Sequence, residues 1–371
     1  MATYRNEKYI TYNQTVGVRQ DMDEAVRILT PSDVPLQQWL STDDTNVTKV
    51  EWLEDELMPQ TFVWTSKTGT SADWTVTSPD TSLLRVGDVY GVKDGTTYTV
   101  QVIVLSVTNP TTAHLAGFAG NTTSPSDGAT LELLGQYNAE GGDPLEPRSI
   151  ERVAKYNLTQ IGQEAVQSTR TARNRGSRGG LYGMGDPYSY ELGKKFKELA
   201  IRFERSLING VRVEDTVNKK RFMGGFFYFL TTNSTSDVKA NIKTALNAAL
   251  RKSYDAGGTP DTIMVSPAIK SVVAGIDETI RREGYDSRSA GYVVDSFMSD
   301  FGAVDIVINR HLPKTKGLVL KKEDCTLINF DPYFHEVLAK TGDSTKGEIV
   351  GEKTLKVKNE VGMGTLTITD A

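Results

Sequence analysis

The chain has 371 residues, of which 38% are hydrophobic and 24% charged, so it can bury a core without disulfides or metal, which excludes disordered and fibrous classes. Its 42 Lys and Arg against 47 Asp and Glu leave a formal charge of -5, without the basic excess of a DNA-binding protein. The sequence has no secretory signal and no long apolar run, which excludes secretion and membrane spanning. Its single cysteine, Cys325, cannot form a disulfide within the chain and favours a reducing cytoplasm.

The first 65 residues are predicted to be mostly extended. Residues 1–45 mix polar residues with scattered tyrosines and prolines, which is typical of an arm that packs on another surface. A short amphipathic hint lies between Met22 and Leu29. From Asn46 to Trp64, strand-forming residues surround an acidic run that contains Glu51, Glu54, Asp55 and Glu56.

A change of composition marks a separate module at residues 66–136. Thr, Ser, Gly and Val dominate, and the segment VGDVYGVKDGTTYTVQVIVLSV alternates strand-like runs with turn signals. After the Gly/Pro-rich segment at 141–147, the strand-like SIERVAKYNLTQI follows. We therefore predict a small all-β module inserted between two extended segments.

The strongest helix signal covers residues 187–209. Asp186 is a natural N-cap, Pro187 fits the first helical position and Gly210 ends the pattern. One face carries the apolar residues Leu192, Phe196, Leu199, Ala200, Phe203 and Leu207. At ~1.5 Å per residue the helix is expected to be roughly 35 Å long.

The remainder predicts a mixed sheet with helices on it. The expected elements are a strand at GGFFYFL, a helix at about 236–254, a strand at DTIMVSP, a short helix at PAIKSVVAGI, a surface loop at 277–290, and strands at GYVVDSFM, AVDIVINR, GLVLKK, CTLINF, HEVLAK and GEKTLKVKNEVGMGTLTIT.

No catalytic, cofactor or metal motif emerges from the sequence. His114, His311 and His335 lie in separate segments, and Cys325 has no partner, so zinc-type spacing is absent. The glycine-rich run at 179–185 lacks the spacing of a phosphate loop and is interpreted as a hinge before the long helix. The acidic run is interpreted as a charged patch, because its carboxylates lack the contrasting environments of an acid/base pair.

One basic cluster stands out, formed by Arg170, Arg173, Arg175 and Arg178. Guanidinium groups suit carboxylate or phosphate partners equally well. Protein contact in an assembly, a solvated loop and nucleic-acid binding all remain open, with stacking aromatics missing from the run itself.

Five collinear segments carry a more specific pattern: YNLTQIGQEAVQSTRTA, DPYSYELGKKFKELAIRFERSLING, RFMGGFFYFLTTN, FGAVDIVINRHLP and LAKTGDSTKGEIVGEKTLKVKNE. They resemble the SU-ten-type family of tailed-phage major capsid proteins. The resemblance covers most of the chain and implies an α+β fold of the Hong Kong ninety-seven-type (Johnson) capsid class.

By that resemblance the chain divides into named capsid regions. These are an N-arm at 1–45, an E-loop at 46–65 and 146–175, an all-β insertion domain at 66–136, a P-domain at 176–235 and 319–371 with its spine helix at 187–209, and an A-domain at 236–318.

The resemblance also implies a structural role without enzyme activity or cofactors. Copies of the chain would assemble as hexamers and pentamers into an icosahedral virion shell around double-stranded DNA, inside the host bacterial cytoplasm. Expected partners are a scaffolding protein, the portal and a decoration protein, with no membrane. We expect Arg170, Arg173, Arg175 and Arg178 to contact Glu51, Glu54 and Glu56 of a neighbouring subunit.

Three other functions are weighed against this one. An encapsulin-like nanocompartment shell would share the fold, but the inserted β-module and the family-specific segments count against it. A tail or adhesion protein with a carbohydrate-binding β-module would explain the Thr-rich region but not the long helix. An enzyme would require a pocket built without any recognisable motif.

Overall fold

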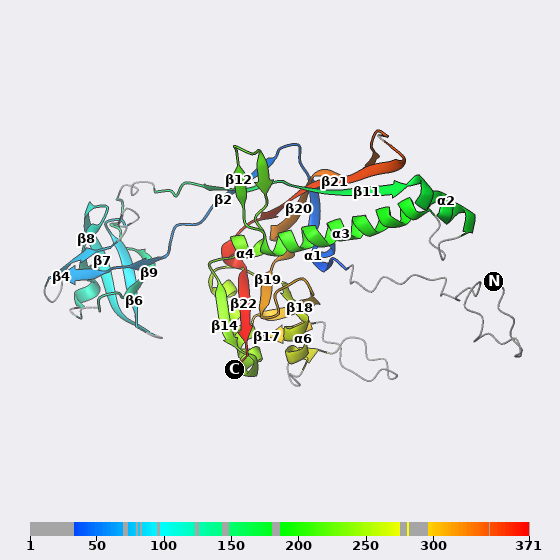
Figure 1. Cartoon of the computed structure of the whole chain (residues 1–371). Coiled ribbons are helices and arrows are strands. Elements are labelled where there is room, and N and C mark those ends of the chain that lie inside the picture. The colour runs from blue at the N-terminus through cyan, green and yellow to red at the C-terminus, as the bar shows by residue number, and fades with distance from the viewer. Residues whose placement is uncertain are drawn as a thin grey trace, which may run out of the picture. The chain divides into compact units, whose positions relative to one another are not determined.

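The computed structural model describes residues 33–69, 73–78, 81, 84–94, 97–121, 123, 126–142, 148–179, 186–274, 280–281, 296–340 and 342–370. These residues form two compact units (Figure 1). One unit contains the described residues up to Trp52 and those from Lys155 onward, and the other extends from Leu53 to Ala154.

A four-stranded sheet forms the elongated part of the first unit (Figure 1). Its strand order is β1-β20-β21-β11, with β1 at Ser41–Asp44, β20 at Cys325–Val337, β21 at Ser344–Val357 and β11 at Gln160–Thr169. β20 and β21 are an antiparallel hairpin, β11 runs antiparallel to β21 along its whole length, and β1 is parallel to β20. Three distant parts of the chain therefore build one platform.

Helix α3 (Pro187–Asn209) lies along this platform and confirms the predicted long helix (Figure 1). The Asp186 side chain accepts a hydrogen bond from Tyr188 N at the start of the helix. Phe203 and Leu199 are buried against β11, where a Cβ atom on Gly162 would collide with both side chains. Glycine at this position allows the helix and the strand to approach closely.

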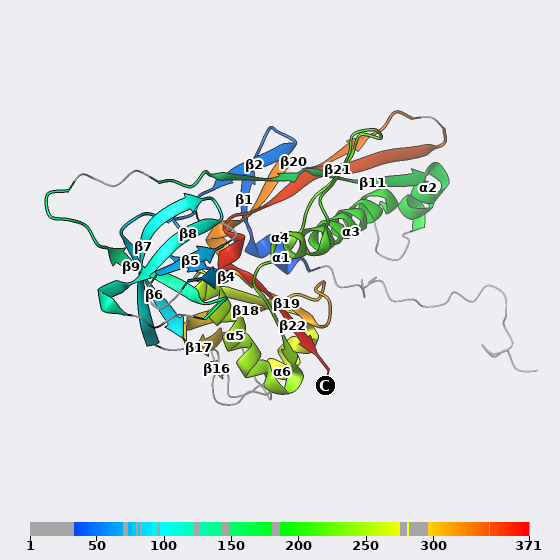
Figure 2. The same cartoon turned by 90° about the vertical axis from the view of Figure 1, so that its left-hand side faces the viewer.

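A seven-stranded mixed sheet forms the rest of the first unit. Its order is β14-β22-β19-β15-β18-β17-β16, with bounds Ser234–Val238, Gly364–Thr369, Lys316–Leu320, Thr262–Val265, Gly302–Ile308, Ser296–Ser299 and Ile280–Arg281. Helices α5 (Ile242–Asp255) and α6 (Pro267–Val273) lie beside it (Figure 2) and share its apolar core. The predicted strand at DTIMVSP and the short helix after it are confirmed.

Short elements complete this unit. Two separate two-stranded ribbons are β12 with β13, which lies wholly in this unit, and β2 with β10, whose strands each extend two residues into the range of the second unit. The strands are β2 (Lys49–Glu54), β10 (Val153–Leu158), β12 (Val213–Asp215) and β13 (Lys220–Phe222). The short helices are α1 (Pro35–Trp39), α2 (Arg170–Gly179) and α4 (Phe226–Phe229).

The second unit is a seven-stranded antiparallel sheet with its own core. The order is β3-β9-β6-β7-β8-β5-β4, with bounds Thr61–Val63, Thr130–Gln136, Asp88–Asp94, Thr97–Asn109, Thr112–Gly117, Asp73–Thr77 and Ser66–Thr68. β3 and β4, the two edge strands of the sheet, are consecutive in the sequence, and Trp64 lies in the short link between them. Its side chain is fully buried together with those of Trp74 and Val102. The sheet therefore curls round an apolar interior.

Two local predictions are wrong. GGFFYFL contains the single-turn helix α4 instead of a strand, because a short apolar run suits either kind of buried element. The helix expected from 236 begins only at Ile242, because β14 pairs in parallel with β22 at the other end of the chain. The sequence predicted no secondary structure for the basic stretch, which forms helix α2 directly after β11 ends at Thr169.

Some expectations lie outside the described residues. They concern residues 1–32, the punctuation segment at 143–147, the glycine-rich run from Gly180 to Gly185, and most of the loop at 277–290.

Candidate intersubunit surface

A buried carboxylate anchors the beginning of the described chain to α3. Glu204 is fully buried, and its oxygens accept hydrogen bonds from Leu36 N at 2.8 Å, Gln37 N at 3.1 Å and Asn309 Nδ2 at 2.8 Å. The Gln37 side chain donates a further bond at 3.2 Å. Charge-assisted bonds to several donors offset the cost of burying a carboxylate.

Contacts around this carboxylate continue the anchor. The Arg310 guanidinium lies 3.0 Å from a carboxylate oxygen of Asp33, and His311 Nε2 lies 3.0 Å from the Asp33 carbonyl oxygen. Trp39 Nε1 donates to Thr262 Oγ1 at 3.2 Å. Residues 33–44 are thus held by side chains and by the pairing of β1 with β20.

Of the four arginines in the predicted basic cluster, Arg170 and Arg173 have described side chains, and both make exposed ion pairs within the chain. Arg170 lies 2.9 Å from Asp343, at the turn between β20 and β21. Arg173 lies 3.5 Å from Asp186 and donates to Thr345 Oγ1 at 3.0 Å. The side chains of Arg175 and Arg178 lie outside the described part of the structure, although α2 includes both residues.

The predicted acidic partners lie on and just after β2. Glu51 is exposed and lies 2.5 Å from Lys49 on the same strand. Glu54 ends the strand half-buried, and Glu56 is exposed beyond it. Within the described chain these glutamates are not joined to Arg170 or Arg173, so the structure leaves the predicted contact between copies untested.

A second charged group joins α3 to β11. Glu164, largely buried, pairs with Lys195 at 3.7 Å and with Arg202. Lys195 also lies 2.6 Å from Glu198, and this hydrogen bond raises the pKa of the lysine. These pairs lie where the helix crosses the strand and so stabilise the platform itself.

An arginine stacked on aromatic rings fixes the β12–β13 hairpin. The Arg212 guanidinium lies 3.8 Å from the Tyr156 ring centroid and 5.3 Å from that of Tyr228. Arg212 also donates to the Tyr156 carbonyl oxygen at 2.6 Å. Stacking of a desolvated arginine on tyrosine contributes about 0.5–2 kcal/mol.

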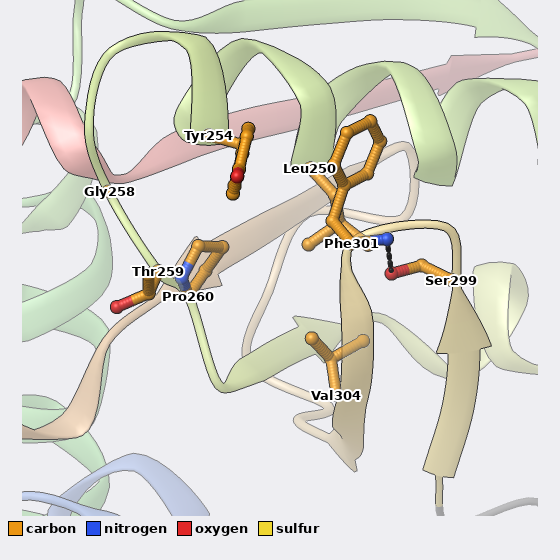
Figure 3. Close-up of a pocket in the computed structure, with 8 residues that line it drawn as sticks. All are labelled: Leu250, Tyr254, Gly258, Thr259, Pro260, Ser299, Phe301 and Val304. Atoms are coloured by element: carbon orange, nitrogen blue, oxygen red, sulfur yellow. Dashed lines mark hydrogen bonds between the residues drawn. The ribbon is translucent and has the colours of Figure 1, made fainter.

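A small crevice lies between the end of α5 and the β17–β18 turn (Figure 3). The rings of Tyr254 and Phe301 face each other across 5.3 Å, and Phe301 N donates to Ser299 Oγ at 3.1 Å. The complete lining is Leu250, Tyr254, Gly258, Thr259, Pro260, Ser299, Phe301 and Val304. These side chains offer an apolar contact and no nucleophile beside a base.

The described residues contain no group of three His, Cys, Asp or Glu side chains that could hold a metal ion. Among them, no helix is long and apolar enough to cross a bilayer. Burial raises the pKa of the Cys325 thiol, whose sulfur lies 3.6 Å from that of Met363.

Sequence reasoning missed the residues that hold these surfaces together. Glu204 is one of many charged residues on an amphipathic helix. Only its position beside Phe203 and Leu207 on the apolar face of α3 indicates in the sequence that it is buried. Arg212 and Asn309 gave no periodic signal, because their partners lie far away in sequence.

Comparison with known families gives a match to nearly the whole chain. The model of the family described as SU10 major capsid protein matches residues 8–370. A curated relative, the major capsid protein of Escherichia phage Phieco32, is 25% identical over 287 residues, which cover 62% of this chain and 80% of the relative.

Solved structures show the same fold. The capsid of Myoviridae phage XM1 aligns with a TM-score of 0.52 at 8% identity, covering 98% of this chain and 100% of the other. A chain of Mycobacterium phage Cain aligns with a TM-score of 0.50 at 10% identity, covering 98% and 99%. The expected α+β capsid fold is thus confirmed.

Proposed function

The chain belongs to the SU10 major capsid protein family, and we propose that its copies close as hexamers and pentamers into an icosahedral shell around packaged double-stranded DNA. It is the major capsid protein of a tailed bacteriophage, located in the virion capsid. The match over residues 8–370 carries this conclusion, because it includes both compact units.

The proposal includes the named capsid regions and their boundaries as predicted from the sequence. α3 is the spine helix of the P-domain, residues 236–318 are the A-domain, and residues 66–136 are an insertion domain in the E-loop. A scaffolding protein, the portal and a decoration protein are the proposed partners. A net charge of -5 suits a shell that does not hold DNA phosphates tightly during packaging and ejection.

We further propose that the arginine cluster contacts the acidic run of a neighbouring copy and that no catalytic step is involved. Support comes from the exposure of the ion pairs that Arg170 and Arg173 make within the chain. Such pairs contribute about 0–1 kcal/mol, so their exchange for partners on another copy costs little.

Light scattering on a size-exclusion column, with negative-stain images of the excluded peak, tests the shell. We expect closed particles of megadalton mass. A chain that stays monomeric, even when it is co-expressed with a scaffolding protein, would contradict the proposal and favour the tail or adhesion protein.

Charge reversal tests the arginine contact separately. We expect Arg170→Glu with Arg173→Glu to lower the yield of shells, and Glu51→Lys with Glu54→Lys to restore part of it. The matched control is Arg251→Glu, since Arg251 makes an exposed pair with Asp255 on α5. Unchanged yield with the arginine variants would show that the pairing is wrong.

A further inference from the structure

The β12–β13 hairpin has two chemically different faces. Its antiparallel register pairs Val213 with Phe222, Glu214 with Arg221, and Asp215 with Lys220. Because successive side chains on a strand point to opposite faces, Val213, Phe222, Asp215 and Lys220 share one face, here called the outer face.

The opposite face is attached to the rest of the first unit. Arg212 stacks on Tyr156 and donates to its carbonyl oxygen. Arg221 donates to Glu352 Oε1 at 2.8 Å, and Glu352 lies on β21. These contacts leave the outer face turned away from the body of the unit.

The outer face carries an exposed apolar stripe. Val211, Val213 and Phe222 are 56%, 53% and 39% exposed, and Val217 at the tip is 86% exposed. Single exposed apolar residues are ordinary, but several gathered on one small ribbon mark a contact surface. An isolated two-stranded ribbon is also only marginally stable in water.

The tip of the hairpin is held in one conformation. The Asp215 carboxylate accepts bonds from Val217 N at 3.1 Å, Asn218 N at 2.9 Å and Asn218 Nδ2 at 2.7 Å. These bonds also lower the pKa of Asp215. A tip that is already ordered loses little conformational entropy when it binds.

We infer that the outer face docks on the same face of a second copy of this chain, about a two-fold axis parallel to the strands. Such an axis lays β12 of one copy over β13 of the other. Since Val213 lies opposite Phe222 and Asp215 opposite Lys220 in the register, the apolar residues then meet apolar residues and each carboxylate meets an ammonium group. The outer face is thus complementary to itself, as a two-fold contact requires.

The inference rests on the proposed function, because the contact is small. Each strand of the ribbon has only three residues, too few to bury the roughly 1,000 Å² expected of an interface that is stable alone. In a closed shell the other contacts hold neighbouring copies together, so a weak contact still forms at high effective concentration.

Cysteine cross-linking in assembled shells tests the contact. Cys325 is the only cysteine and is buried, so Val217→Cys introduces the only accessible thiol. Facing ribbons stack about 10 Å apart, so a bis-maleimide of that span should join the two tips. We expect covalent dimers without a ladder of larger cross-linked products, because a two-fold contact joins only two copies.

Two controls sharpen the test. Val337→Cys, 57% exposed on β20, controls for thiols that react merely because they are exposed, and we expect at least tenfold less dimer from it. Adding Lys220→Glu to Val217→Cys should reduce the dimer several-fold, because two carboxylates then face two on the other copy. Thr216→Cys, also at the exposed tip, replaces Val217→Cys if that variant does not assemble.

The outcomes separate the two proposals. Shells that form normally but give no dimer with either tip cysteine, or that give a ladder, would overturn the hairpin contact and leave the capsid function intact. Failure of the unmodified chain to form shells, even when it is co-expressed with a scaffolding protein, would instead contradict the proposed function, and the hairpin contact would be rejected with it.

Discussion

Replacing Glu204 by Gln should release the N-terminal anchor while leaving α3 folded. The carboxylate accepts four hydrogen bonds inside the unit, from the backbone N–H groups of Leu36 and Gln37 and from the side chains of Gln37 and Asn309. Glutamine keeps the size and one acceptor oxygen, but its NH₂ group faces donors where the second oxygen stood.

The expected loss follows from this count. Hydrogen bonds to a charged acceptor contribute about 1.5–3 kcal/mol each, and a buried donor left without a partner costs about 1–3 kcal/mol. Losing one oxygen and the charge should therefore cost about 2–4 kcal/mol in the local opening of residues 33–44. At about 1.4 kcal/mol per factor of ten, amide exchange there should accelerate roughly 30- to 700-fold.

Hydrogen exchange read by mass spectrometry on peptides covering 33–44 measures this effect. The matched control is Glu198→Gln on the same helix, whose carboxylate makes a partly exposed pair with Lys195 and should change exchange by less than about threefold. If Glu204→Gln left the exchange of 33–44 within threefold of wild type, while α3 kept its protection, the anchoring role would be refuted.

Three further predictions concern other sites. Arg148→Met should destabilise the second unit by about 3–5 kcal/mol, because it leaves the buried Asp88 carboxylate without the guanidinium group that lies 2.9 Å away. The measurement is the loss of hydrogen-exchange protection in β6. The control is Arg152→Met, which removes an exposed pair with Asp55 and should change the protection little. Burial, with Asp88 nearby, raises the pKa of Tyr90 from 10.0 to about 12. The contribution of Tyr90 to the stability of the second unit is therefore complete below pH 10 and is lost as the pH rises toward 12. In a pH titration of the folded protein, the tyrosinate absorbance should show a step near pH 12 that Tyr90→Phe removes. Gly162→Ala should force α3 away from β11 and lower the unfolding midpoint of the first unit in urea, whereas Gly193→Ala on the open side of α3 should not.

The parts of the fold that sequence predicts best are those specified by neighbouring residues. α3 combines an Asp186 cap, Pro187 and an apolar stripe, and all three signals lie within 25 residues, so its bounds agree with the prediction. β15 is a short and wholly buried run in which three of the four residues are apolar, and α6 after it has a serine cap. The capsid fold itself was predicted from resemblance, since no local signal specifies it.

The predictions that failed are those decided by distant partners. The sequence from Ser236 to Val238 predicts the start of a helix, but these residues belong to β14, which pairs with β22 more than 120 residues later. The helical turn at Phe226–Phe229 begins beside Gly210, where Gly225 N donates to the Gly210 carbonyl oxygen at 2.9 Å, a contact that the local sequence does not reveal. Glu204 was missed for the same reason, because its donors lie more than 100 residues away on either side.

The distribution of strong and weak contacts fits a subunit that must assemble without error. Pairs that fix the shape of one chain, such as Glu204 with Asn309 and Asp88 with Arg148, are buried, where removing one partner is costly. Of the residues proposed to join neighbouring copies, Arg170, Arg173 and Glu51 make exposed pairs that salt and water weaken. A misplaced subunit bound by such contacts can dissociate before the shell closes around it, whereas the fold that it carries stays intact. Reversible association through many weak contacts suits the assembly of a closed symmetric surface.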